Sequence, residues 1–253
     1  MPEYRIYEFN TPNNNGGSNW KDRITSILPI LGIMLIIWVG LIGLSGVISR
    51  LFLMLPIIPI FVMSLVLHEL SHAYMANFLG DPTPRLTGRL TLNPVKHLDL
   101  WGTLLFFVCG FGWAKPVQVD ASYFRKPDRA MVSVALAGPL CNFLLALTGP
   151  ILYRLLFSFA YSQGYIEILK FICIQTCYIN LVLAVFNLLP VPPLDGSRLI
   201  HYILPPKYKA IYYQFSREYA LILFFLVYMF AGSMISPVVS QLQSSIWNFV
   251  LKF

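Results

Sequence analysis

The residues best suited to chemistry are the pentad His68-Glu69-Leu70-Ser71-His72, which stands in a largely apolar stretch. On a helix, positions i and i+4 project from one face, so the imidazoles of His68 and His72 can reach a single metal ion. Glu69 lies between them, close enough to serve an attacking water as catalytic acid and base. The pattern predicts a hydrolytic site with one Zn²⁺ per chain, with another divalent ion as the alternative. The alternative, histidines that only hydrogen-bond inside a helix bundle, would leave costly unpaired groups in apolar surroundings.

A hydrolytic zinc ion usually takes three protein ligands, so a third ligand is expected elsewhere in the chain. The best candidate is Asp195. The prolines at positions 190, 192 and 193 end the preceding helix, and Gly196 permits a sharp turn. The alternative interpretation of Asp195 is a solvated turn at the membrane boundary. His97 and His201 are competing ligands, more typical of groups near the site or at the interface.

Two asparagines are further candidates for contact with substrate or transition state. Asn142 follows Gly138 in the stretch Ala137-Gly138-Pro139-Leu140-Cys141-Asn142, where an amide in an apolar helix can hydrogen-bond at the site. A contact that only joins two helices is the alternative. Asn187 opens the proline-rich element that ends at Gly196.

Composition places these residues in a membrane. Of 253 residues, 57% are hydrophobic and 11% charged, whereas soluble domains carry about 25% charged residues. The apolar runs predict an all-α polytopic protein with five transmembrane helices, at about 24–49, 57–79, 130–153, 168–189 and 219–236. We expect residues 241–253 to lie at the interface, with a sixth, tilted crossing as the alternative.

Charge predicts the orientation of these spans. Lys and Arg concentrate in the N-terminal tail, in 80–129 and in 191–218, which the positive-inside rule makes cytoplasmic. The net charge of +7 therefore indicates topology, not nucleic-acid binding. With Gly80 as the helix stop, His72 and His68 lie about 12 and 18 Å from it along the helix axis, which predicts a metal site well below the cytoplasmic surface.

The remaining segments predict a single membrane-embedded domain over 24–253, with a catalytic core at about 55–200, after a flexible polar tail at 1–23 without a cleavable signal peptide. The short apolar run 103–111 predicts a re-entrant or surface-lying segment. The alternation in 85–92 predicts a short strand or hairpin, which could hold an unwound peptide as an added strand. A loop that only packs on the core is the alternative.

Three separated motifs, taken in order, resemble the site-2 protease family of intramembrane zinc metalloproteases. They are His68 to His72, Gly138 with Asn142, and Asn187 to Gly196. The stretches 88–103 and 112–117 are similar to the compact bacterial branch of the family, without PDZ or CBS modules.

This resemblance implies a protease in the bacterial cell membrane, with its active site toward the cytoplasm. It would cleave within or near transmembrane segments of other membrane proteins in the lipid bilayer. Two alternatives remain. A metal transporter would need further acidic groups along its spans, and an inactive binding homologue would have no use for Glu69.

Overall fold

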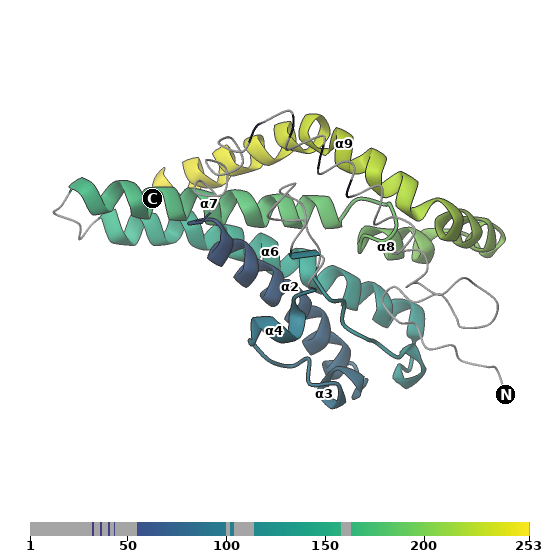
Figure 1. The fold of residues 1–253 in the computed structure, drawn as a ribbon. Helices are drawn as coiled ribbons and strands as arrows, with labels where there is room; N and C mark the ends of the chain where they lie inside the picture. The colour runs from purple at the N-terminus through teal and green to yellow at the C-terminus, as the bar shows by residue number, and fades with distance from the viewer. Residues whose placement is uncertain are drawn as a thin grey trace.

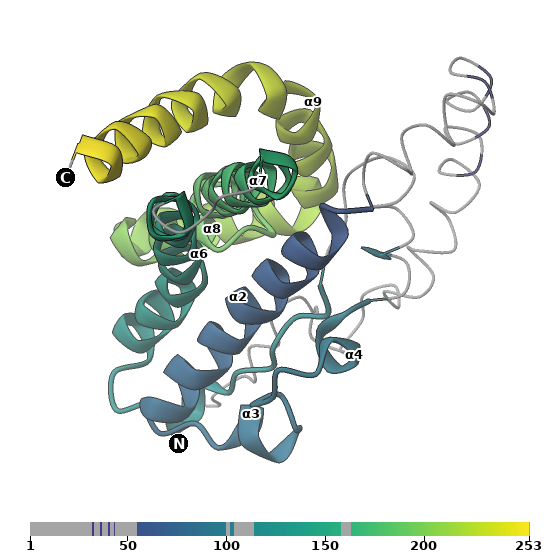
Figure 2. The ribbon, with the colours of Figure 1, turned by 90° about the vertical axis from the view of Figure 1, so that its left-hand side faces the viewer.

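The computed structural model describes residues 32, 36, 40, 43, 55–99, 102–103, 114–157 and 163–252. Within these residues the chain is mostly helical (Figures 1 and 2). The long helices are α2 (Ile58–Phe78), α6 (Pro127–Phe157), α7 (Gln163–Asn187) and α9 (Pro206–Lys252). Short helices connect them: α3 (Thr83–Leu86), α4 (Pro94–His97), η1 (Ala121–Tyr123) and α8 (Gly196–Ile203).

Helix α2 has clear local start and stop signals. A proline stands in its first turn, where the missing amide donor has no helical partner to lose. At the other end, Gly80 adopts a φ of 110°, which a residue with a side chain rarely adopts. The amide of Asp81 then bonds back to the Ala76 carbonyl at 3.0 Å. The stop predicted at Gly80 is confirmed.

Helix α6 packs along both α2 and α7, and α9 arches over α7 (Figures 1 and 2). The contact between α6 and α7 is close because of Gly149, where a Cβ would lie 2.3 Å from the Cys173 carbonyl oxygen. Helices α6, α7 and α9 also meet in one buried cluster, which contains Ala146, Leu181 and Val239. The helices therefore form one packed unit around α6 and α7.

Three helices among the described residues are long and apolar enough to cross a membrane: Ile58–Phe78, Pro127–Leu156 and Glu167–Asn187. They correspond to the second, third and fourth expected spans, which confirms an integral membrane protein with a helical fold. The first expected span, the polar tail and most of the 103–111 segment lie outside the described residues. Residues 219–236 and 241–252 belong to the single helix α9, and the interfacial position expected for 241–253 stays a prediction.

The strand or hairpin expected at 85–92 is wrong. Residues Thr83–Leu86 form α3, with prolines at its N-cap and first turn that favour helical φ values. Gly88, at a φ of 68°, then turns the chain so that the Arg89 amide reaches the Pro84 carbonyl at 2.8 Å. The described residues contain no longer strand pairing, only an isolated antiparallel bridge between Leu98 and Ala114.

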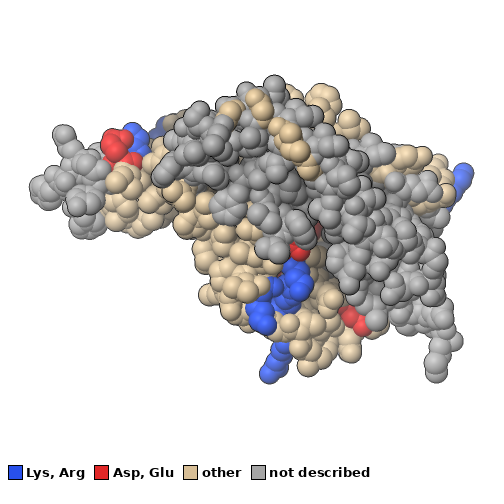
Figure 3. Space-filling view, in the orientation of Figure 1, with Lys and Arg blue, Asp and Glu red and all other residues tan. Residues whose placement is uncertain are grey.

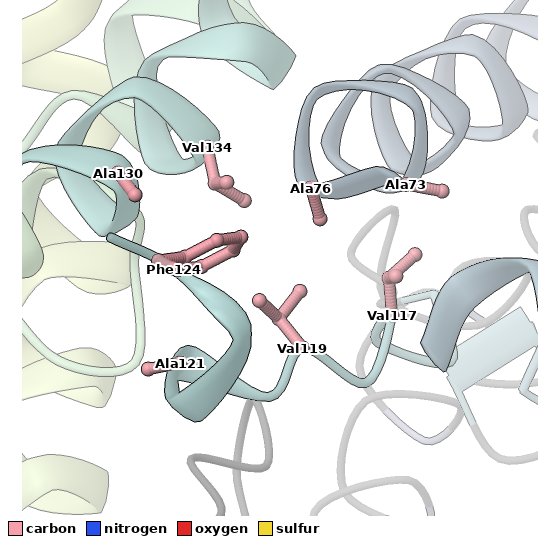
Figure 4. Packing of buried hydrophobic residues seen from close by; sticks show 8 residues of the cluster. All are labelled: Ala73, Ala76, Val117, Val119, Ala121, Phe124, Ala130 and Val134. Atoms are coloured by element: carbon pink, nitrogen blue, oxygen red, sulfur yellow. The ribbon is translucent and has the colours of Figure 1, made fainter. Parts of the chain in front are cut away.

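Residues 114–124 form a strap, extended as far as Asp120 and followed by η1, which runs beneath the C-terminal half of α2. Figure 4 shows its side chains, Val119 and Phe124 among them, pointing toward Ala76 of α2 and Val134 of α6. Asp81 fixes the strap at one point, because its carboxylate accepts the Asp120 amide at 2.8 Å and the Thr83 amide at 2.9 Å. The strap therefore has a defined position relative to the pentad on α2.

Candidate metal centre

The two imidazoles of α2 lie together in the interior, as the i, i+4 spacing predicts. The Nε2 atoms of His68 and His72 are 3.1 Å apart, and the rings stand nearly perpendicular at 84°. Their residues are 5% and 2% exposed, so water does not satisfy these nitrogen atoms from bulk solvent.

Helix α6 supports both rings along one face. A Cβ at Gly138 would lie 2.4 Å from His72 Nε2 and 2.6 Å from His68 Cε1, so the helix touches the rings through a position without a side chain. One turn before it, the Val134 carbonyl lies 2.7 Å from His72 Nδ1. One turn after it, Asn142 Oδ1 bonds to His68 Nδ1. Oxygen partners on Nδ1 leave each Nε2 lone pair for a metal ion.

Asp195 reaches the histidines through the turn that joins α7 to α8. After α7 the chain turns through short-range backbone hydrogen bonds, among them the Leu194 amide to the Val191 carbonyl at 2.9 Å. The peptide bond between Pro192 and Pro193 is cis. Gly196 lets the turn fold onto the end of α7, since a Cβ there would lie 2.2 Å from the Leu188 carbonyl oxygen.

The three ligand atoms have the spacing that a tetrahedral ion requires. Asp195 Oδ2 lies 3.2 Å from each histidine Nε2, and the two Nε2 atoms are 3.1 Å apart. In a tetrahedral site with contacts of about 2.0 to 2.1 Å, neighbouring ligand atoms stand about 3.3 to 3.4 Å apart. Within the described part of the chain, the buried Asp195 Oδ2 has no hydrogen-bond partner. The residues present therefore fit a zinc ion.

Charge reinforces the carboxylate as a ligand. Burial alone would raise the pKa of Asp195, but the facing His72 and His68 side chains hold it well below its ordinary value. The partly buried Arg198 lies near this carboxylate. Burial lowers the pKa of its guanidinium to about 10, while Asp195 and Glu69 oppose that shift, so Arg198 stays charged at neutral pH.

Glu69 lies at the side of the centre that faces the strap. Its Oε2 accepts the backbone amide of Val117 at 3.2 Å, which orients the carboxylate. Burial lowers the pKa of Arg89, and the negative charge of Glu69 opposes that shift. The Arg89 guanidinium donates to the Lys96 carbonyl and, at 3.3 Å, to the Lys115 carbonyl, two residues from the Val117 amide.

The other predicted site residues lie apart from the three ligand atoms. Asn142 is fully buried behind His68, and its amide nitrogen donates to Asn180 at 2.8 Å, so both ends of its side chain are engaged inside the protein. Asn187 donates to the Leu183 carbonyl of its own helix at 2.9 Å. The Nε2 of buried His97 lies 2.8 Å from the Thr91 carbonyl. The His201 side chain is outside the described residues.

Sequence reasoning missed several residues around the centre. Asn180 and Ser64 are buried polar residues in apolar spans, the same signal that identified Asn142. Arg89 stands in a segment interpreted as a strand, which hid its role as a buried anchor. The Val117 amide left no signal, because every residue except proline carries one.

The candidate site combines two imidazoles from a membrane-spanning helix with a carboxylate from the turn between α7 and α8. This arrangement defines a membrane protein with an internal metal site. Comparison with known proteins narrows this class. Residues 158–231 match Peptidase family M50. No solved structure matches the chain significantly.

Several relatives are similar over a longer stretch. "Putative zinc metalloprotease YwhC" of Bacillus subtilis is 44% identical over 174 residues, which cover 66% of this chain and 77% of the relative. "Putative zinc metalloprotease Rip2" of Mycobacterium tuberculosis is 33% identical over 64% of this chain, and the match spans 63% of Rip2, less than two thirds of its length. "Zinc metalloprotease MJ0392" of Methanocaldococcus jannaschii is 28% identical over 75% of this chain and 47% of its own. The chain belongs to peptidase family M50, the site-2 protease family that its motifs resemble.

Proposed function

We propose that this M50 peptidase is an intramembrane zinc metalloprotease, which hydrolyses peptide bonds within or near transmembrane segments of other membrane proteins. The observation that supports it best is the triangle of buried ligand atoms from His68, His72 and Asp195, at 3.1 to 3.2 Å. Its family and the names of its relatives support zinc and proteolysis. They do not favour a transporter or an inactive homologue.

The proposed reaction assigns each residue of the centre a separate task. His68, His72 and Asp195 would hold the zinc ion, which when bound supplies Lewis-acid chemistry that polarises the scissile carbonyl and activates water. Glu69, oriented by the Val117 amide, accepts the proton of the attacking water. The same carboxyl group then protonates the leaving amine.

The substrate must present an unwound peptide at this depth. A transmembrane helix engages its carbonyls in internal hydrogen bonds, so cleavage requires local loss of helix. We therefore propose that segments with helix-breaking residues near the scissile bond are preferred.

The proposed setting is a bacterial cell membrane, with residues 24–253 as a single domain of five transmembrane helices and the centre toward the cytoplasm. Exposed basic side chains support this orientation. Arg85, Lys96 and Lys115 are exposed in the segments that follow α2, and Figure 3 shows Lys and Arg gathered on the part of the molecule that carries α3 and α4 in Figure 1.

Replacing Glu69 by Gln tests the proposal. The variant keeps the three ligands, so zinc content should equal that of the wild type. Loss of the general base should lower cleavage of reconstituted single-span peptides by about 10²- to 10⁴-fold. Cleavage would be followed by mass spectrometry in proteoliposomes, with and without a Gly-Pro pair at the middle of the peptide.

The matched control is Glu167→Gln, the same change at an exposed position of α7, which should retain full activity. Undiminished cleavage by Glu69→Gln would remove the acid/base role. Equal absence of cleavage in wild-type zinc-loaded protein across peptides of both kinds would contradict the proposed activity.

A further inference from the structure

Behind the metal centre, three buried polar side chains from three different helices form a continuous hydrogen-bonded chain. They are Ser64 of α2, Asn142 of α6 and Asn180 of α7, with exposures of 3%, 0% and 1%. Polar groups in a membrane-spanning bundle are costly unless paired. Their linkage to His68 indicates a task beyond holding the helices together.

The direction of this chain is fixed at its far end. The Thr176 backbone carbonyl can only accept, so the atom of Asn180 that lies 2.9 Å from it must be the donating Nδ2. The same nitrogen donates to Ser64 Oγ at 2.9 Å. The amide of Asn180 therefore turns its other atom, the accepting Oδ1, toward α6.

The orientation passes from Asn180 to Asn142. Because Asn180 presents an acceptor, Asn142 must direct its Nδ2 there, at 2.8 Å, and this nitrogen also lies 3.4 Å from the Ser64 carbonyl, a second obligate acceptor. The remaining atom of Asn142, the accepting Oδ1, then faces His68 Nδ1. A proton is required on that nitrogen, which leaves the Nε2 lone pair toward Asp195 and His72.

We propose that Asn180 is a positioning residue, which sets the tautomer of His68 through Asn142 and thereby prepares the imidazole to bind zinc. The two histidines differ in this respect, because the Val134 backbone carbonyl fixes His72 directly. An amide can rotate by half a turn and offer either a donor or an acceptor, so Asn142 needs the second amide behind it. The inference rests on the proposed zinc site.

The experiment compares zinc dissociation constants of the purified full-length protein, measured by competition with a chromophoric chelator. Asn180→Leu removes the oriented amide at similar volume. The dissociation constant should rise by about tenfold or more, within the range of about 10- to 100-fold seen when the partners of metal ligands are lost. Ser64→Ala, which leaves the bond to the Thr176 carbonyl in place, should give a smaller rise.

Two further variants separate orientation from packing. Thr176→Val removes a hydroxyl that bonds the Ile172 carbonyl of the same helix at 2.8 Å, and it keeps the backbone carbonyl of the relay. Its zinc affinity should match the wild type. Asn142→Asp places an acceptor before His68 in either orientation. In that background Asn180→Leu should weaken zinc binding much less than it does alone.

An affinity of Asn180→Leu within twofold of wild type and Thr176→Val would overturn the proposal. The proposal would also fail if Asn180→Leu lowered zinc affinity as much in the Asn142→Asp background as it does alone. Such a result would indicate packing damage, which does not depend on the orientation of the amide. If Asn180→Leu does not fold, the same affinity measured with Ser64→Ala decides, and no rise there would refute the relay. Because the readout is zinc affinity, a protein that binds zinc but cleaves nothing would refute the proposed activity and leave this test intact.

Discussion

Gly138 is the residue on which the shape of the metal centre depends most directly. The rings of His68 and His72 occupy the space that a side chain at this position would fill, with the nearest atom 2.4 Å from the ideal Cβ. Real Cβ atoms do not approach other atoms so closely, so any substitution must move the rings or push α6 away from α2. The helical backbone itself would accept alanine.

We therefore expect Gly138→Ala to weaken zinc binding by about tenfold or more, because displaced ligands lose the geometry that zinc requires. Zinc content after equilibrium dialysis measures this. The matched control is Gly232→Ala in α9, where a Cβ meets nothing within 4 Å and the lower entropic cost of alanine should stabilise the helix by about 0.5 to 1 kcal/mol. Equal zinc content in the two variants would show that α6 does not define the position of the rings.

At the scale of residues, spacing along the sequence predicts the two histidines of the centre but not the backbone contact from the strap. His68 and His72 belong to one helix, so their convergence follows from the helical period alone. Asp195 comes from a distant turn, and was identified because a hydrolytic ion needs a third ligand. The Val117 amide is a backbone group whose position depends on tertiary packing, so no residue pattern indicated it.

Among the elements, the strap at 114–124 contacts the proposed catalytic carboxylate, although it contains no site residue predicted from the sequence. It delivers the Val117 amide to Glu69, and Asp81 holds it through the Asp120 amide. The carboxylate of Asp81 accepts two backbone donors and is fully buried. Its loss should therefore affect both stability and the orientation of Glu69.

Asp81→Asn tests this anchor. One acceptor oxygen becomes a donor that faces a backbone donor, which should lower the free energy of unfolding by about 1 to 3 kcal/mol. Thermal unfolding in detergent would measure the change. Asp128→Asn is the matched control, since its exposed contact with Lys209 at 3.5 Å should contribute at most about 1 kcal/mol. A smaller loss for Asp81 than for Asp128 would contradict the anchoring role.

The elements that sequence reasoning misjudged share a physical cause. The alternation in 85–92 is typical of a strand, but prolines at 82 and 84 set helical φ values just before it. Among the described residues, no neighbouring strand pairs with it. The helical spans were easier to predict, because about twenty apolar residues satisfy their own backbone only as a helix in lipid. Helix α9 joins an apolar run to a more polar one, a continuity that hydropathy windows divide.

On the scale of the whole molecule, the metal ion would connect parts of the bundle that are far apart in the chain. Its ligands come from α2 and from the N-cap of α8, while α6 supports the rings from between them. A ligand bound only by the folded state stabilises it by mass action, by about 2.7 kcal/mol when free zinc is a hundred times the dissociation constant.

Removing the metal with a chelator should therefore lower the unfolding temperature, and adding zinc should restore it. The Asp195→Ala variant should unfold at nearly the same temperature with and without zinc, because it has lost one of the three ligands and should bind zinc only weakly. The Asp128→Ala variant, altered at the surface, should keep the full zinc-dependent shift. Identical shifts in both variants would transfer the third-ligand role away from Asp195.

The separation of the ligands along the chain also has a consequence for biosynthesis. Because Asp195 lies beyond the third membrane-crossing helix described here, a ribosome must synthesise all three of these helices before the last proposed ligand exists. Until then the nascent chain carries His68, Glu69 and His72 without the third proposed ligand. An unfinished chain of this kind therefore lacks one of the three proposed zinc ligands.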